Sequence, residues 1–348
     1  MNDKRLFNLL KCHSSLPTAT KTLSSMYGGK QEKGLFRYTL GDLQTRILPG
    51  PHYFVAQLNE KRGIERRKPQ AVCSIRQQFD GKLFNFNKIK PDEVILEMLK
   101  SDEGGSEDNR ETAPCKMVVL VNVSPLEFGH SLFVPDPSLC LPQVLTRFAI
   151  QSGIESVLMS SDPGFRMGFN SLGAFASVNH LHLHGYYLDH ELYVETVPVT
   201  PLLPHIGFYS LSEFPAGFMF YTESGGLDEV AKAVCQVTDF LVDADVCHNL
   251  FLTRGCPPYS PEQGHVDRSL RSGVRIIVWP KKACFGAKEE SAFNVALCEL
   301  AGHLPFKNME EYQRATEDGV LDIIQKFLPP KEEFLKLEQQ LIQHLRDK

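Results

Sequence analysis

The chain has 348 residues, of which 42% are apolar and 23% are charged, so it can bury a large core, in roughly two domains. Its formal net charge of −5 argues against broad nucleic-acid binding, which normally needs a basic surface. Apolar runs are too short for a signal peptide or a membrane span. The nine cysteines include no C-x-x-C pair, which favours reduced thiols and a cytoplasmic location over a disulfide framework or zinc knuckle.

Two charged segments stand out in the first third of the chain. Residues 60–68 hold five basic side chains, which favours a solvated loop, with a phosphate-facing loop or a nuclear-import patch as alternatives. Residues 101–111 are acidic, rich in Gly and Ser, and free of apolar side chains. Such a segment cannot bury enough apolar surface to fold, so it predicts a disordered insertion rather than an acidic site.

After this insertion the pattern becomes that of strands. Four strands are predicted, over residues 117–123, 130–135, 165–170 and 177–188. The first two should form an antiparallel hairpin. Between the second and third, helical apolar spacing from 139 to 158 predicts a helix with Pro142 near its first turn.

The last 120 residues are richer in helical periodicity. Helices are predicted over 227–241, 288–303, 308–328 and 331–346, and strands over 249–254 and 274–279. Consecutive, hairpin-linked strands with interspersed helices indicate an α+β fold with a largely antiparallel sheet and flanking helices. The glycine-rich motifs of dinucleotide-binding and P-loop proteins are missing from the sequence.

The most informative segment places three histidines at alternating positions, His180, His182 and His184. On a strand they would share one face, with successive Cα atoms about 6.6 Å apart, while Leu181 and Leu183 point into a core. Three polar rings on one face would each need a partner, which weighs against chance clustering. A metal site is an alternative, because H-x-H on a strand can supply two zinc ligands.

Covalent catalysis at phosphorus explains this cluster best. A neutral imidazole is a good nucleophile near pH 7 and leaves readily from a phosphoramidate, so one difficult displacement becomes two easier ones. We expect His182 to be the nucleophile, with His180 and His184 donating hydrogen bonds to phosphate oxygens. Small residues upstream allow backbone N–H groups to approach a phosphate: Ser171, Gly173, Ala174, Ala176 and Ser177.

The histidine segment resembles the His-x-His-x-His motif of the histidine-triad superfamily. Residues 122–135 resemble that superfamily's preceding hairpin, and Asn170 stands where it has an asparagine before the phosphate loop. A longer resemblance, from about residue 36 to 320, is to the GDP-hexose phosphorylase family, and within it to the animal-type branch that acts on GDP-D-glucose. It rests on FRYTL, LPGPHYFVAQLNE, FDGKLFNFNKI, NVSPLEFGHSLFVP, FNSLGAFASVNHLHLHGYYL, VWPKK and FNVALCELAGHL.

This resemblance implies a histidine-triad-like nucleotidyltransferase that binds GDP-hexose and inorganic phosphate and needs no metal or other cofactor. The central histidine, here His182, attacks the α-phosphorus, hexose 1-phosphate leaves, and phosphate then releases GDP from a GMP–histidine intermediate. The implied substrate contacts are His180, His184, Asn170, Ser171 and Ser177. In the plant GDP-L-galactose branch the third motif position is glutamine, so the triad alone leaves open a hydrolase that releases GMP. A noncatalytic nucleotide-sugar sensor is the other alternative.

An internal similarity in the sequence suggests two fused halves. We expect an N-terminal extension over 1–35, a catalytic half over 36–200, and a degenerate half with a helical tail over 201–348. Residues 248–282 echo the strand–strand–proline pattern of residues 117–135 without the histidines. In related two-half proteins the second half completes the nucleotide pocket, which makes four basic residues candidate contacts: Arg254, Arg275, Lys281 and Lys282.

Overall fold

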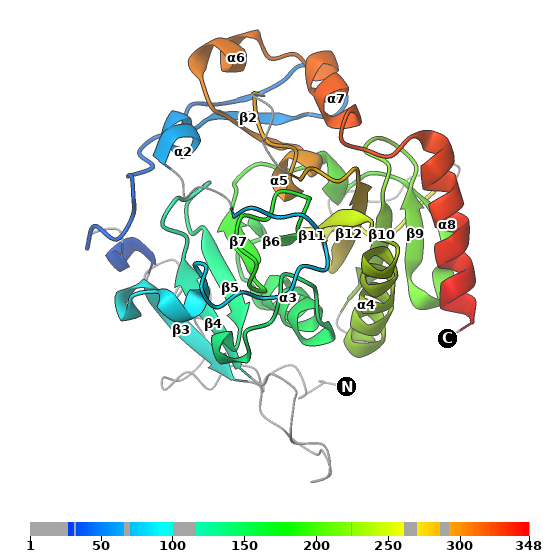
Figure 1. Ribbon diagram of the computed structural model, residues 1–348. Helices are drawn as coiled ribbons and strands as arrows, with labels where there is room; N and C mark the ends of the chain where they lie inside the picture. The colour runs from blue at the N-terminus through cyan, green and yellow to red at the C-terminus, as the bar shows by residue number, and fades with distance from the viewer. Residues whose placement is uncertain are drawn as a thin grey trace, which may run out of the picture.

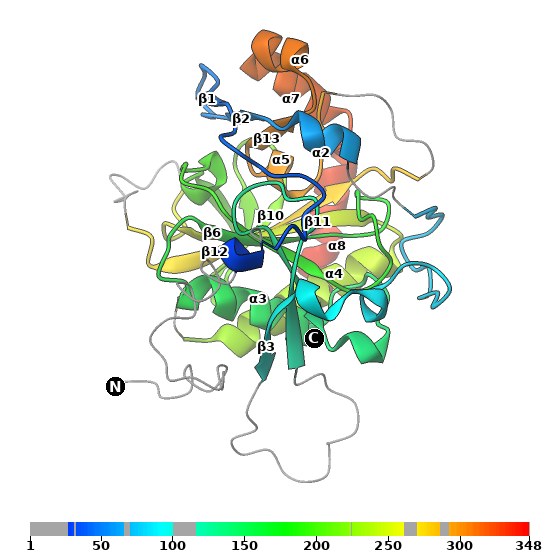
Figure 2. The same ribbon diagram turned by 90° about the vertical axis from the view of Figure 1, so that its left-hand side faces the viewer.

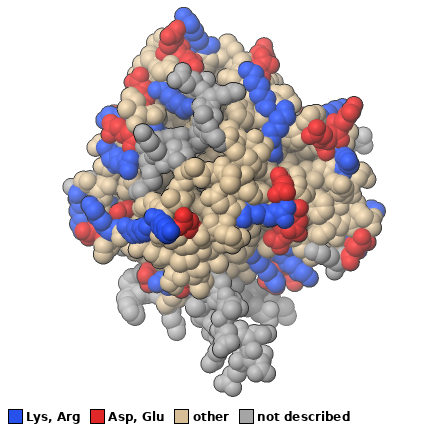
Figure 3. All heavy atoms as spheres, in the orientation of Figure 1, with Lys and Arg blue, Asp and Glu red and all other residues tan. Residues whose placement is uncertain are grey.

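The computed structural model describes residues 27–30, 33–65, 70–99, 116–223, 225–260, 270–285 and 292–347. The expected disordered insertion and most of the expected N-terminal extension lie outside these residues. Each helix in the described part is too short or too polar to cross a membrane. On the face drawn in Figure 3, acidic and basic side chains are interspersed, and the described residues visible there form no continuous basic region.

Ten strands of the described residues form one antiparallel sheet at the centre of the molecule (Figure 1). In spatial order they are β3 (Val94–Leu99), β4 (Lys116–Val121), β5 (Ser131–Pro135), β7 (Leu183–Tyr187), β6 (Phe165–Asn170), β11 (Cys247–Gly255), β12 (Gly273–Lys281), β10 (Phe218–Thr222), β9 (Phe208–Leu211) and β8 (Val199–Leu203). The predicted α+β class and antiparallel sheet are confirmed. The predicted hairpin is also confirmed, as β4 paired with β5.

One connectivity occurs on both sides of the sheet's centre. The first side runs β3-β4-β5-α3-β6-β7 along the chain and the second runs β8-β9-β10-α4-β11-β12. On each side the last strand lies between the two strands that flank the helix in sequence, and β6 meets β11 with Asn170 opposite Asn249. The expected match of 248–282 to 117–135 is therefore wrong, because β11 and β12 take the places of β6 and β7.

Three helices cover one face of the sheet: α3 (Arg147–Met159), α4 (Leu227–Asp243) and α8 (Lys331–Arg346) (Figure 1). The last two match their predictions, and α8 buries Phe334 and Leu341 against this core. Helix α3 begins later than predicted, at Arg147, because the Thr146 side chain accepts a hydrogen bond from the Ala149 N–H and caps the helix there. Pro142 lies in the irregular segment before it.

The other face is partly covered by a small sheet that the sequence did not predict. Its strands are β1 (Thr45–Ile47), β2 (Val55–Leu58) and β13 (His303–Phe306), and β2 and β13 pair in parallel. Four short helices surround it: α2 (Glu60–Glu65), α5 (Leu297–Leu300), α6 (Met309–Arg314) and α7 (Glu317–Gln325). Figures 1 and 2 both show the N-terminal α2 and β2, in blue, beside these C-terminal elements, in orange.

Two helix predictions fail in this region. Of the helix expected over 288–303, the described residues contain only the single turn of α5. The helix expected over 308–328 is two helices, because Ala315 is extended and the Thr316 hydroxyl caps the N-terminus of α7. The apolar residues of this region are buried between the two sheets. Their spacing along the sequence resembles the spacing in a helix, which is why helices were predicted.

Candidate active site

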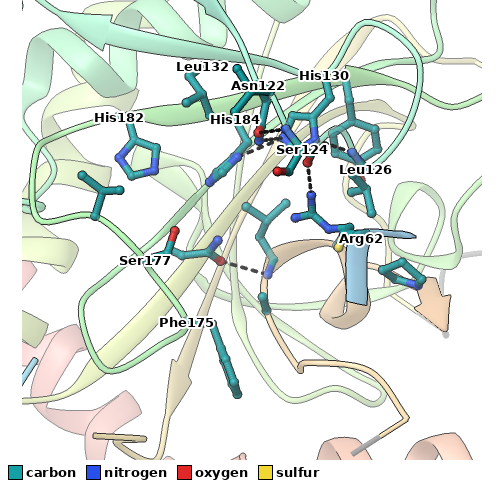
Figure 4. Close-up of a pocket in the computed structure, with 18 of the residues that line it drawn as sticks. Arg62, Asn122, Ser124, Leu126, His130, Leu132, Phe175, Ser177, His182 and His184 are labelled. Atoms are coloured by element: carbon teal, nitrogen blue, oxygen red, sulfur yellow. Dashed lines mark hydrogen bonds between the residues drawn. The ribbon is translucent and has the colours of Figure 1, made fainter. Parts of the chain in front are cut away.

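A pocket opens on the sheet face opposite α3 and α4, over β4, β5, β7 and the end of β6 (Figure 4). Its walls also include α2, the 3₁₀ turn η2 (Phe86–Lys88), and residues between 294 and 307. Elements from both ends of the chain therefore enclose one cavity. Its titratable lining side chains are Arg62, Glu93, His130, His182, His184, Tyr186, Cys298, Glu299 and Lys307.

Four of the six expected site residues line this pocket: Asn170, Ser177, His182 and His184. Ser171 does not line it. Its hydroxyl is used inside the fold, since Oγ accepts from the His248 N–H at 2.9 Å and donates to the Leu172 carbonyl at 3.1 Å. The structure therefore gives no support to a direct phosphate contact from Ser171.

His180 also lies away from the pocket lining. Its ring packs against Phe79 and Phe86, with ring centroids 5.0 and 5.3 Å apart. Its Nδ1 accepts a hydrogen bond from the Phe86 N–H at 3.0 Å. The expected donation from this ring to a phosphate finds no support, because the ring does not line the pocket and its Nδ1 holds η2. It is the His180 carbonyl that bonds to His182.

The ladder of β7 begins only at Leu183, so His180 and His182 precede the strand that was expected to carry them. The alternation of faces nevertheless holds. Leu181 and Leu183 are buried in the core beneath the helices, while His182 and His184 face the pocket. The pattern in the sequence thus predicted the directions of His182 and His184 correctly, whereas His180 does not line the pocket and only His184 lies in the hydrogen-bonded strand.

His182 is held in one tautomer by the chain around it. Its Nδ1 lies 2.7 Å from the His180 carbonyl, which can only accept, so Nδ1 carries the proton and Nε2 presents its lone pair. Burial lowers the pKa of His182 to about 4; the His180 carbonyl opposes this shift and the His180 ring adds to it. The ring is therefore uncharged at neutral pH, as a nucleophile must be.

Gln143 fixes the main chain of His182 from both sides. Its Oε1 accepts from the His182 N–H at 3.0 Å, and its Nε2 donates to the carbonyls of His182 and Asn170 at 3.1 and 3.0 Å. The side chain is 1% exposed, so these bonds replace water that cannot reach the groups. No local sequence pattern indicates this role, because the partners lie 27 and 39 residues away.

Replacing Gln143 with alanine should lower the free energy of unfolding by about 2 to 4 kcal/mol, because three buried main-chain groups lose their partner. It should also reduce kcat more than it changes KM, since the loop that carries His182 is released. Urea denaturation and steady-state kinetics would measure both effects. Gln340→Ala, at an exposed position of α8, is the matched control, and equal behaviour of the two variants would contradict the role.

A second hydrogen-bonded chain sets the tautomer of His184. The Leu126 N–H donates to His130 Nδ1 at 2.8 Å, so neutral His130 carries its proton on Nε2. That nitrogen lies 3.0 Å from His184 Nδ1 (Figure 4), which accepts, leaving the His184 proton on Nε2. Asn122 Nδ2 also lies 3.1 Å from His130 Nε2. Because a neutral imidazole cannot accept at both nitrogens, the shorter bond from the fixed backbone amide decides the tautomer.

His182 and His184 thus offer complementary groups side by side. Their ring centroids are 5.1 Å apart, and one presents a lone pair where the other presents an N–H. Burial holds the pKa of His184 well below its usual range, and the His182 ring and Arg62 lower it further. Asn170 adds a second donor: its Oδ1 accepts from Asn249 and Leu297, which leaves Nδ2 for the pocket it lines. This arrangement suits nucleophilic attack on an atom that carries negatively charged oxygens.

Burial lowers the pKa of six described histidines: His130, His180, His182, His184, His248 and His303. Their unfolded-state pKa is near 6.5, so below that pH the unfolded chain binds more protons than the folded one. The free energy of unfolding should therefore fall as the pH drops from about 6.5 toward 4, by at most about 1.4 kcal/mol per histidine per pH unit. Urea midpoints measured at about pH 7.5 and pH 5 test this, and equal midpoints would refute it.

The four basic residues expected to contact substrate from the second half do not line the pocket. All four donate to carbonyls of the fold instead: Arg254 to Val157 and Leu158, Arg275 to Cys256, Val194 and Val197, Lys281 to Val295, and Lys282 to Lys326. The positive charges in the pocket are Arg62 and Lys307. Arg62 belongs to the basic segment 60–68, whose remaining residues 66–68 lie outside the described part.

The described residues contain no group of three His, Cys, Asp or Glu side chains placed to hold a metal ion, so the structure does not support the alternative of a metal site. The seven described cysteines are free thiols, as expected. The fold is thus an antiparallel sheet with a helical layer on one face and, on the other face, a pocket that His182 and His184 line.

Comparisons with known proteins identify the family of the chain. Residues 20–186 match the family domain described as "GDPGP1-like, N-terminal domain", and residues 193–348 match "GDPGP1-like, C-terminal domain". GDP-D-glucose phosphorylase 1 of Danio rerio is 58% identical over 324 residues, 93% of this chain and 90% of that one. The protein of the same name from Xenopus laevis is 49% identical over 361 residues, 96% and 90% of the two chains. The chain therefore belongs to the GDPGP1-like family.

The fold also has a solved counterpart. The yeast Ap4A phosphorylase Apa2 in complex with Ap4A superposes with a TM-score of 0.59 over 91% of this chain and 99% of that chain. Sequence identity between the two is only 13%, so this likeness concerns the fold alone.

Proposed function

We propose that this chain phosphorolyses GDP-D-glucose, forming GDP and glucose 1-phosphate through a GMP–His182 intermediate. Relatives that carry the name GDP-D-glucose phosphorylase 1 align over nine-tenths of the chain. The single structural observation that supports the covalent route is the 2.7 Å bond from His182 Nδ1 to the His180 carbonyl, which leaves Nε2 unprotonated in the pocket.

In the first step His182 Nε2 attacks the α-phosphorus. A P–N bond forms, the phosphoanhydride P–O bond breaks, and its electron pair leaves with glucose 1-phosphate. A phosphate monoester has a second pKa near 6, so this leaving group departs as a dianion and needs no proton donor. The N–H groups of His184 Nε2 and Asn170 Nδ2 stabilise the charge on the non-bridging oxygens of the α-phosphate.

The apolar end of the pocket is suited to the nucleoside. Its side chains are Phe84, Phe86 and Ile89 in and next to η2, Leu132 on β5, and Val178 in the loop before β7. The Phe86 ring lies 5.1 Å from the His182 ring, so a flat base packed here would sit next to the reacting nitrogen. The opposite end is polar and is left for the sugar phosphate.

The decisive experiment is a product analysis with GDP-glucose and phosphate. GDP and glucose 1-phosphate should appear in equal amounts, at a rate that a chelator does not change because we propose no metal cofactor. GMP as the main product would instead indicate a hydrolase, and nucleotide-sugar binding without turnover would indicate a sensor.

A further inference from the structure

The polar end of the pocket is built from two segments about 245 residues apart in the chain. Strands β2 and β13 pair in parallel, with Leu58 opposite Phe306, so the residues that follow each strand emerge at the same edge. Arg62 follows β2 on α2, and Lys307 follows β13 directly. Both side chains line the pocket.

Direct packing keeps these two positions together. A Cβ placed on Gly63 would lie only 3.2 Å from Lys307 Cβ, so Lys307 passes over the one position of α2 that has no side chain. Gly63 is the immediate neighbour of Arg62. The glycine thus permits two cationic side chains from distant parts of the sequence to approach one wall of the cavity.

Arg62 is positioned by neutral partners. A guanidinium N–H donates to the Ser124 carbonyl (Figure 4), and among the described residues no carboxylate forms an ion pair with it. Its charge is felt across the site, since it contributes to the lowered pKa of both His130 and His184. A half-buried arginine that keeps spare donors beside the reacting histidines suits an anionic ligand.

We infer that Arg62 and Lys307 form one subsite that binds two phosphate groups in succession. The first is the phosphate of the departing glucose 1-phosphate, and the second is the inorganic phosphate that replaces it. This inference rests on the proposed function. In an in-line displacement the leaving oxygen departs opposite the attacking nitrogen, and the acceptor must attack from that same side to displace the nitrogen. One subsite must therefore serve both anions.

The second step shows why two cations are needed there. An oxygen of hydrogen phosphate bonds to the phosphorus of the GMP–His182 intermediate, the P–N bond breaks, and its electron pair returns to Nε2. The proton of hydrogen phosphate stays on the new β-phosphate of GDP or is released to water. The attacking dianion approaches a phosphorus whose oxygens are already negative, and Arg62 and Lys307 offset this repulsion.

The test compares Arg62→Gln, Arg62→Lys and Lys307→Gln with Lys61→Gln, an exposed position of the same helix. For the two neutral replacements we expect KM for inorganic phosphate to rise about tenfold or more, since a charge-assisted bond to the anion is lost. The ratio of GDP to GMP should fall, because water competes better for the intermediate. Arg62→Lys should recover part of the loss, and Lys61→Gln should match the wild type.

Two outcomes separate this inference from the proposed function. If both neutral variants keep the wild-type KM for phosphate and the wild-type ratio of GDP to GMP, the subsite is not here, whatever their turnover. If the Arg62 variants misfold, Lys307→Gln still tests the inference. Lys307 is half-buried, so its replacement should leave the thermal unfolding temperature nearly unchanged. If the wild-type enzyme itself forms no GDP from GDP-glucose and phosphate, the proposed function fails and the subsite loses its basis.

Discussion

Alanine in place of His182 should lower turnover of GDP-glucose by about 10⁴-fold or more, since the nucleophile itself is removed. No other histidine that lines the pocket can take over, because His184 presents an N–H to it and both ring nitrogens of His130 are hydrogen-bonded. Chromatography of the products would measure the loss. Intact-mass analysis after incubation with GDP-glucose in the absence of phosphate should show one added GMP group on the wild type and none on the variant.

The matched control is His205→Ala, at an exposed histidine outside the pocket, which should behave as the wild type. Residual activity of His182→Ala above about one hundredth of wild type would exclude covalent catalysis by this ring. An adduct that persists in the variant would point to a different nucleophile.

Much of the fold follows from periodicity within single elements. The strand over 165–170 and the helices α4 and α8 were predicted with small errors, because each buries one continuous face. The region between residue 292 and α8 was not, since its apolar residues are buried between two sheets and β13 exists only by pairing with β2. Alternation and helical spacing cannot be told apart when both sides of a segment are buried.

Some residues of the site could also be predicted from the sequence and others could not. The directions of His182 and His184 were readable from alternation, and Asn170 from the resemblance to the histidine-triad motif. The supporting groups were not, because their partners are fixed by tertiary structure: Gln143 acts on main-chain atoms, and Lys307 meets α2 only after β2 and β13 pair. His130 stood inside the hairpin motif, but its role depends on a cross-strand contact to His184 that spans 54 residues.

Phenylalanine in place of His130 should reduce kcat by about 10²- to 10³-fold, the usual cost of losing one oriented donor to a developing charge. Without the His130 Nε2–H, nothing holds the His184 proton on Nε2. The His184 ring can then keep its proton on Nδ1 and turn a lone pair toward the phosphate oxygens, which repels them. His130 is thus a positioning residue, because it acts through His184 and not on the substrate.

His130→Gln separates this role from simple packing. A glutamine side chain can donate an amide N–H toward His184 Nδ1, so kcat should recover by about tenfold or more relative to His130→Phe. Thermal unfolding of both variants should be measured alongside, because each removes the bond from the Leu126 N–H and loses similar stability. If the two variants lose equal stability and equal activity, His130 contributes only to packing. If they lose equal stability while only the phenylalanine variant loses turnover, the tautomer of His184 is what His130 controls.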